Sequence, residues 1–338
     1  NWKAPTAFKQ HGYVFAAAGI ALIFWAEHAA GMLHSPQATA MLILSIIILA
    51  GIAGLLFQRR TWCRYLCPLG GMIGSISTCS AVELRSNFNM CTIECRDHQC
   101  RTAVGKKSGG CPVFEAPFSL RSNQHCVLCG ECIRVCPKGA PVLNARIPGS
   151  ELWNVRTADR TAAVLGIVLV GTQIFRLAGL LGMLHGRDGA DAVWWISALA
   201  MTGSLAAAFL IVRFVALTIF PKNTTLDQPL IRSMYTLLPI AAATEMAYHL
   251  ERFLTLGGGL VATLGKQTGI DISFSALIAL PSTVHRHQTI LLIVGTTASL
   301  LLARKYANDA GKKDFRVIRS GWIYLAFGVG VVITFLTR

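Results

Sequence analysis

Long apolar stretches constrain this chain more than any other feature, because they are long enough to cross a membrane. A helix needs about 20 mainly apolar residues to span the hydrocarbon core. Seven runs approach or exceed this length: 13–33, 38–57, 161–184, 193–220, 233–255, 288–304 and 320–337. The stretch 41-MLILSIIILAGIAGLLF-57 contains no charged residue, which is rare in core helices of soluble proteins. The sequence therefore predicts an all-α polytopic membrane bundle of about seven transmembrane helices.

The distribution of basic residues explains the net charge of +15. The segments 1–12, 58–160, 213–232 and 304–319 carry 25 of the 31 Lys and Arg residues, and the seven spans place these segments on one side. An excess of Lys and Arg marks the cytoplasmic side. We therefore predict a multi-pass protein of the bacterial inner membrane with its N-terminus inside and its C-terminus outside. The lipid bilayer accounts for the charge, and nucleic acid is not expected as a partner. The chain begins with Asn1 rather than Met, which leaves open whether an upstream segment is missing.

All eleven cysteines lie between Cys63 and Cys136, in the predicted cytoplasmic insert. Structural disulfides are rare in the reducing cytoplasm, so metal binding is the stronger interpretation. We expect three parts: two transmembrane helices in 1–62, a metal-binding insert in 63–150, and five transmembrane helices in 151–338. The insert has no long apolar periodicity, which predicts short elements organised around metal.

The stretch 126-CVLCGECIRVCP-137 has the spacing C-x2-C-x2-C-x3-C-P. This is the ligand run of bacterial two-cluster ferredoxins, in which the fourth cysteine binds the neighbouring cluster. Zinc is the alternative, but zinc ribbons use two separated C-x2-C pairs, so an iron–sulfur cluster is favoured.

A second set of cysteines lies upstream, in 91-CTIECRDHQC-100 and at Cys111-Pro112. The spacing is looser than in the standard run, but it keeps four cysteines and a terminal Cys-Pro. The crossed pairing of two-cluster ferredoxins then predicts two [4Fe–4S] clusters. The ligands of cluster one are Cys91, Cys95, Cys100 and Cys136. The ligands of cluster two are Cys126, Cys129, Cys132 and Cys111. The inserted residues 101–110 leave open whether cluster one has four or three irons.

A further pair, Cys63 and Cys67, lies in 59-RRTWCRYLCPLGG-71 at the end of the second apolar run. With this motif and the run 126–137, residues 40–145 resemble the polyferredoxin-type membrane iron–sulfur proteins. That family includes the quinol-oxidising subunit of periplasmic nitrate reductase and the membrane electron donor of nitrous oxide reductase. The resemblance implies electron transfer between the quinone pool and other redox subunits of a respiratory complex. Some members carry two C-x3-C-P motifs, whereas this chain has one. Redox-active thiols, ligands of a further centre and buried small residues all remain open as roles for Cys63 and Cys67.

Ionisable residues inside membrane spans are costly, so they are functional candidates. Glu245 and His249 stand four residues apart and share a helix face with Arg252. A carboxylate and an imidazole near the membrane surface suit quinol oxidation, which releases protons as well as electrons. The alternative is that Arg176 pairs with Glu27 or Glu245 and stabilises the bundle. The remaining candidates in or beside the spans are His28, His285 and His287.

Two other functions compete with electron transfer to or from quinone. A membrane iron–sulfur protein of this kind also suits a metal reductase or an assembly factor for a metalloenzyme such as an oxidase. A redox sensor would need an output domain, which the sequence does not reveal. If quinol is oxidised on the outer side, electrons must cross a hydrocarbon core of about 30 Å, which calls for an intermediate centre. Cys63 and Cys67 are one candidate for it, and a haem held by His28 and His249 is another. The direction of electron flow is left open.

Overall fold

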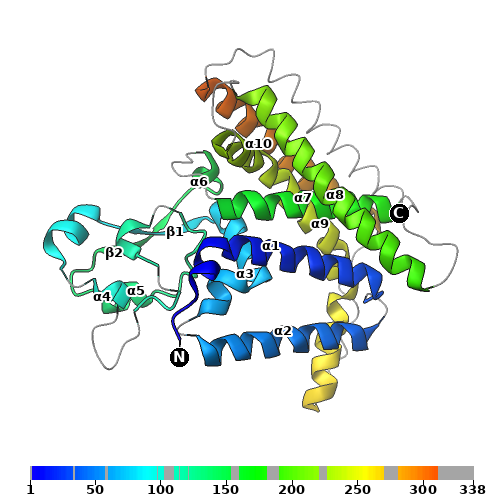
Figure 1. Cartoon of the computed structure of the whole chain (residues 1–338), viewed down its shortest axis with the longest axis horizontal. Coiled ribbons are helices and arrows are strands. Elements are labelled where there is room, and N and C mark those ends of the chain that lie inside the picture. Colours follow the sequence, from blue (N-terminus) through cyan, green and yellow to red (C-terminus); the bar gives the residue numbers. More distant parts are fainter. Residues whose placement is uncertain are drawn as a thin grey trace. The chain divides into compact units, whose positions relative to one another are not determined.

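The computed structural model is mostly helical (Figure 1). It describes residues 2–32, 35–57, 60–96, 98–102, 110–113, 115–120, 122–153, 160–180, 190–220, 227–269 and 281–310. These residues form two compact units, Asn1–Val168 with Gly186–Met201, and Leu169–His185 with Thr202–Arg338. We call them the insert unit and the bundle unit, and each is described by itself.

Five of the described helices are long and apolar enough to cross a membrane. Their apolar spans are Thr6–Ala29 in α1, Pro36–Leu56 in α2, Ala162–Gly179 in α7 (Arg160–Leu180), Trp194–Ile219 in α8 (Ala190–Ile219) and Ser282–Asp309 in α10 (Pro281–Asp309). The predicted span 233–255 lies within α9 (Asp227–Thr268). Polar residues such as Glu245 and His249 lower the hydropathy of that helix, and it is not among the five. The predicted span 320–337 lies outside the described residues.

The insert unit begins with two helices, α1 (Thr6–Ala29) and α2 (Pro36–Leu56). The backbone N–H of Trp2 donates to the carbonyl of Leu56 (2.7 Å), so the start of the described chain meets the end of α2. A single π-helical turn, η1 (Trp62–Leu66), follows and packs on α1. Gly12 of α1 makes this possible, because a Cβ there would lie 3.0 Å from Tyr65. The next helix, α3 (Pro68–Ile76), also packs on α1.

The cysteine-rich insert consists of short elements, as the sequence predicts. In chain order they are η2 (Ser77–Cys79), β1 (Val82–Ser86), η3 (Met90–Glu94), α4 (Gln99–Thr102), η4 (Pro117–Ser119), α5 (Glu131–Val135), β2 (Pro141–Ala145) and α6 (Ser150–Trp153). Strands β1 and β2 form an antiparallel pair, with Val82 opposite Ala145 and Ser86 opposite Pro141. The apolar core beside them is small and centres on Leu84, Cys100 and Cys132. Two cysteines thus belong to the core itself.

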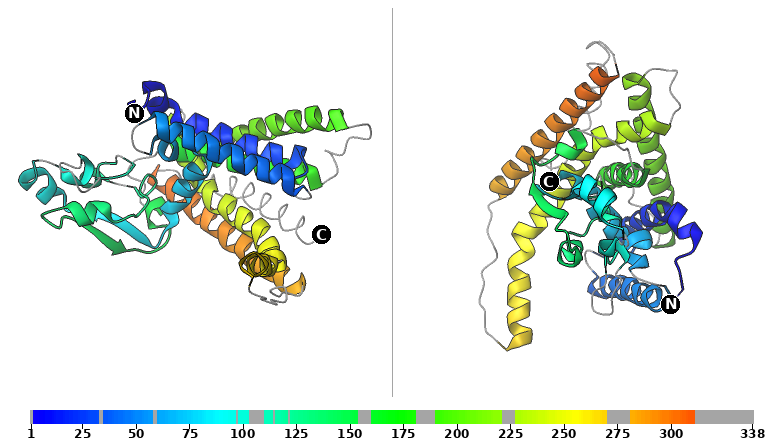
Figure 2. Two further views of the ribbon diagram at one scale, coloured as in Figure 1. Left: turned by 90° about the horizontal axis from the view of Figure 1, so that it is seen from below. Right: turned by 90° about the vertical axis from the view of Figure 1, so that its left-hand side faces the viewer.

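Helices α9 and α10 pack along each other in the bundle unit (Figure 2). Pro239 lies inside α9, where its ring disrupts the helical hydrogen bonds. The next backbone N–H, that of Ile240, donates to the Ser299 hydroxyl of α10 (3.1 Å). A neighbouring helix thus supplies a hydrogen-bond partner beside the proline, as membrane helices require. Gly295 brings the two helices close, since a Cβ there would lie 2.4 Å from the Cβ of Ala243.

Candidate iron–sulfur and intramembrane sites

The eight cysteines predicted as ligands form two groups of four, which we call quartet one and quartet two. Burial, followed by electrostatic repulsion from three neighbouring thiols, raises the pKa of Cys100 to about 11. Those three thiols belong to Cys136, Cys91 and Cys95. Burial and three other thiols raise the pKa of Cys132 to about 12. They belong to Cys126, Cys111 and Cys129. Electrostatic interactions between thiols thus occur within each set of four, and the assignment of these cysteines as cluster ligands stays a prediction.

Quartet two surrounds an open cavity with apolar walls. All four of its cysteines line this cavity, together with side chains such as Leu84, Val113 and Leu120. Within the described ranges, no three side chains of metal-binding types converge on a single ion position. A cubane attaches its four cysteines to different irons, so its ligand sulfurs surround a space instead of meeting at one point. Four thiol groups around one cavity match the ligand set of such a cluster.

The ligand loops contain the two non-glycine residues of the described chain with a positive φ. His98 (φ 45°) lies between Cys95 and Cys100, and Leu128 (φ 49°) lies between Cys126 and Cys129. Such conformations are uncommon and concentrate at binding sites. The Leu128 backbone N–H donates a hydrogen bond to the Cys126 sulfur. Amide donors of this kind stabilise a charged sulfur ligand. The His98 ring stacks on that of Phe118, with the ring centroids 4.2 Å apart.

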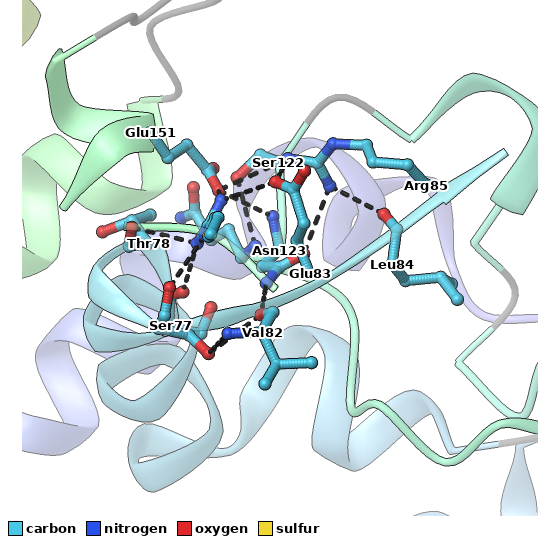
Figure 3. A network of polar contacts seen from close by, with 12 residues as sticks. Ser77, Thr78, Val82, Glu83, Leu84, Arg85, Ser122, Asn123 and Glu151 are labelled. Carbon is cyan, nitrogen blue, oxygen red and sulfur yellow. Dashed lines mark hydrogen bonds and ion pairs between the residues drawn. The ribbon is translucent and has the colours of Figure 1, made fainter. Parts of the chain in front are cut away.

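A buried polar network holds the backbone that precedes Cys126 (Figure 3). Arg146 is its hub, and its guanidinium donates to the carboxylates of Glu83 (3.0 Å) and Glu151 (2.6 Å). Glu151 also accepts from the backbone N–H of Asn123 (3.3 Å). The carbonyl of Asn123, whose side chain is fully buried, in turn accepts from the N–H of Cys126 (2.8 Å). The network was not evident from the sequence, because its members are scattered from Ser77 to Glu151 without a motif.

Cys63 and Cys67 have the same local backbone as Cys91 and Cys95. Each pair spans one π-helical turn, η1 or η3, and the second cysteine is extended (ψ 116° in both). The C-x3-C spacing of Cys63 and Cys67 did not indicate a π turn. Cys63 is exposed, and Cys67 caps α3 by accepting a hydrogen bond from the Gly70 N–H (3.3 Å). The remaining cysteine, Cys79, is half-buried, and burial raises the pKa of its thiol.

In the bundle unit, Glu245 is the centre of a polar cluster between α7 and α9. It accepts hydrogen bonds from Gln173 and from Arg176 (2.8 Å), and its other oxygen lies 3.1 Å from Nε2 of His249. The carboxylate is buried, whereas the His249 side chain is 56% exposed. The predicted alternative of an Arg176–Glu245 ion pair is therefore present. Sequence analysis missed Gln173, because a neutral residue in a span gives no charge signal.

Other polar side chains contact α9 next to Glu245, at Tyr248 and Ala247. The guanidinium groups of Arg176 and Arg252 lie over the Tyr248 ring, at 4.1 and 4.5 Å from its centroid. His285 of α10 contacts Gln288 (3.2 Å), which donates to the carbonyl of Ala247 (3.0 Å). His287 instead contacts the carbonyl of Thr283 on its own helix. A haem held by His28 and His249 stays a prediction, because those residues belong to different units.

The described chain is thus a largely helical protein with five candidate membrane helices and a cysteine-rich insert at 63–136. No family model matches it, and no solved structure matches it. Over 128 residues, 37% of the chain, it is 33% identical to YccM of Escherichia coli, which is named for a proposed role in electron transport. It is 28% identical over 110 residues to an uncharacterised protein of Methanocaldococcus jannaschii. It is 32% identical over 103 residues, 30% of the chain, to the protein NirI of Paracoccus denitrificans.

The matches cover only part of this chain and only part of each relative. The matched segments cover 23% of YccM, 39% of the Methanocaldococcus protein and 14% of NirI. The chain therefore shares a segment with these proteins, and nothing about their remaining parts carries over to it.

Proposed function

We propose that this chain is a membrane-bound electron-transfer protein that carries two [4Fe–4S] clusters and exchanges electrons between the quinone pool and a respiratory redox partner. The observation that carries the proposal is the crossed grouping of the cysteines. Cys111 joins the later motif, and Cys136 joins the earlier one. When bound, each cluster supplies a one-electron carrier. The basic segments favour a cytoplasmic location for the insert, and the role after which YccM is named is in line with electron transport.

The residues of the insert have clear tasks in such a site. The cysteine thiolates would hold the clusters, and three of them, Cys91, Cys100 and Cys132, are buried. Backbone donors such as the Leu128 N–H stabilise the charge on the sulfurs and thereby influence the reduction potential. The N–H of Cys111 donates to the carbonyl of Cys100 (2.8 Å). This hydrogen bond links the two quartets directly and offers a short route for an electron between them.

Glu245 and His249 are the candidates for the quinol site. Arg176 stabilises the carboxylate charge of Glu245, and the carboxylate orients the more exposed imidazole of His249. An Nε2–H donated to Glu245 leaves the lone pair on Nδ1 of His249. Nδ1 is then the atom that accepts a proton from a quinol hydroxyl, while Glu245 acts as a positioning residue. Oxidation of one quinol releases two protons and two electrons, and the electrons leave one at a time.

The test is reduction of the full chain by a quinol analogue in proteoliposomes under anaerobic conditions. We expect Glu245→Gln to slow the reduction at least tenfold without loss of iron, because Glu245 positions the His249 imidazole, and proton transfer by a positioned side chain contributes roughly 10²–10⁴-fold. Glu251→Gln on the same helix is the control and should change the rate little. If Glu245→Gln reduces at the parent rate, the quinol site is elsewhere.

A metal reductase or oxidase-assembly function is the second candidate, favoured by the exposure of Cys63 beside the cluster-binding insert. Replacing Cys63 and Cys67 together with Ser separates the two functions. If the pair serves as a relay from quinol, the variant keeps both clusters but is no longer reduced by the quinol analogue. If the pair delivers electrons to a metal ion, the variant is still reduced by the quinol analogue, but it no longer reduces added Cu²⁺.

A further inference from the structure

Quartet two lies next to the membrane helices of the insert unit. The segment that follows Cys111 is bound to the turn η1 at the end of α2. Arg60 N–H donates to the carbonyl of Pro112 (3.4 Å), and the Arg64 guanidinium donates to the carbonyl of Val113 (2.5 Å). A second Arg64 nitrogen pairs with the carboxylate of Glu115 (2.6 Å). This quartet is therefore the one placed to exchange electrons with the membrane.

Helix α3 contacts the second segment that supplies quartet two, the loop before Cys126. A Cβ on Gly74 would lie 2.4 Å from the carbonyl oxygen of Gln124, two residues before Cys126. The segment that follows Cys111 is thus fixed to η1, and the segment before Cys126 is fixed to α3.

Quartet one follows the Ser86–Pro141 end of the β1–β2 pair. The Val82–Ala145 end of the pair adjoins η2 and α6, through the Arg146 network. The Ser86–Pro141 end leads to quartet one, because Asn87 donates to the carbonyl of Ala140 (3.1 Å) and Cys91 donates to the carbonyl of Asn87 (3.0 Å). A strand of this length spans roughly 15 Å. Quartet one therefore lies beyond the end of the sheet that is remote from η2 and α6.

The surface beside quartet one carries two large apolar side chains in an otherwise polar loop. Phe88 is 62% exposed, and Ile93, between Cys91 and Cys95, is 77% exposed. Arg96 and Lys138 are exposed nearby, and Lys138 pairs with the exposed carboxylate of Glu94 (3.6 Å). The sequence of the region 58–160 contains 14 Lys and Arg residues but 7 Asp and Glu residues. An apolar contact within a basic field suits a partner with an acidic rim, because complementary charge steers association.

We infer that the face formed by Phe88 and Ile93, with Arg96 and Lys138 around it, docks a small acidic electron-carrier protein at quartet one. The inference rests on the proposed function and specifies the partner and its place of contact. One electron passes between quartet one and the carrier in each encounter, and no proton or bond is exchanged. The order of transfer is then membrane, quartet two, quartet one and carrier, or the reverse.

The test uses the full chain in lipid nanodiscs and a plant-type [2Fe–2S] ferredoxin as the acidic probe, with binding measured by surface immobilisation. We expect Ile93→Ser to weaken binding about tenfold, the loss typical of one central apolar contact. Ile147→Ser is the matched control, since Ile147 is 79% exposed and lies at the other end of β2. It should leave binding unchanged, whereas about 0.5 M salt should weaken it by screening.

Iron content is measured on every variant, so that the two proposals fail separately. Normal iron with equal binding by the parent and Ile93→Ser chains, or no binding at all, overturns the docking face and leaves the proposed function standing. Absence of clusters from the parent chain overturns the proposed function whatever binds. A spin label at position 93 gives a second readout: collision with a water-soluble nickel complex agrees with docking, and collision with lipid-dissolved oxygen identifies a lipid contact and overturns it.

Discussion

The cysteine-rich insert and the α9–α10 pair are stabilised in different ways. Helices α9 and α10 bury many apolar side chains against each other, among them Ile240, Ala247 and Leu292. The insert has one two-stranded sheet, helices of five residues or fewer after α3, and an apolar core that includes two candidate metal ligands. Apolar packing thus contributes most to the helix pair, whereas we expect the stability of the insert to depend on what its cysteines bind.

Removing iron should therefore separate the two regions most strongly. We expect anaerobic chelation to reduce amide hydrogen-exchange protection in residues 82–145 by about two orders of magnitude or more, because metal binding and folding are coupled. Protection in α9 and α10 should stay as it was. Equal protection in the insert with and without iron would mean that its fold does not depend on metal.

A smaller change should disturb one quartet and leave the other. Gly74→Val forces the loop before Cys126 to move, since a Cβ at this position lies 2.4 Å from the Gln124 carbonyl. We expect loss of about half of the iron and of one of two electron paramagnetic resonance signals. The control is Gly54→Val in α2, where nothing lies within 4 Å of the added carbon. Full iron in Gly74→Val would contradict the proposed link between α3 and quartet two.

The reciprocal change weakens the helix pair but not the insert. Gly295→Val places carbon atoms against the Ala243 Cβ and within 3.0 Å of the Pro239 carbonyl. We expect a destabilisation of about 1–3 kcal/mol, the usual cost of overpacking, visible as a lower unfolding midpoint in detergent. Iron content should not change. Gly203→Val has open space around it and serves as the comparison.

Sequence patterns identified the parts of this chain whose chemistry is local. Apolar runs predict the candidate membrane helices, because length and hydropathy suffice, and cysteine spacing predicts the quartets. Contacts between distant segments gave no such signal. The Arg146 network and the Gln173–Glu245 contact depend on side chains brought together by folding. The shared π turn at Cys63 and Cys91 was hidden as well, since C-x3-C spacing does not specify the type of helical turn.

The cysteines outside the two quartets should differ in how fast they react with an alkylating agent. We expect alkylation of the iron-loaded protein at pH 8 to label Cys63 first and Cys79 slowly. Cys63 is exposed, whereas burial raises the pKa of Cys79, so less of its reactive thiolate is present at this pH. Mass spectrometry of the labelled peptides gives the order. Early labelling of Cys129, which is also exposed, would indicate that it is not a ligand.

The central claim is that quartet one and quartet two each hold a [4Fe–4S] cluster, and iron and sulfide analysis of the anaerobically purified chain tests it most directly. Two cubanes predict about eight irons and about eight acid-labile sulfides per chain. Cys129→Ala and Cys95→Ala should each reduce both values by about half, while Cys79→Ala leaves them unchanged. About four irons in the parent chain, or zinc in place of iron, would contradict the account.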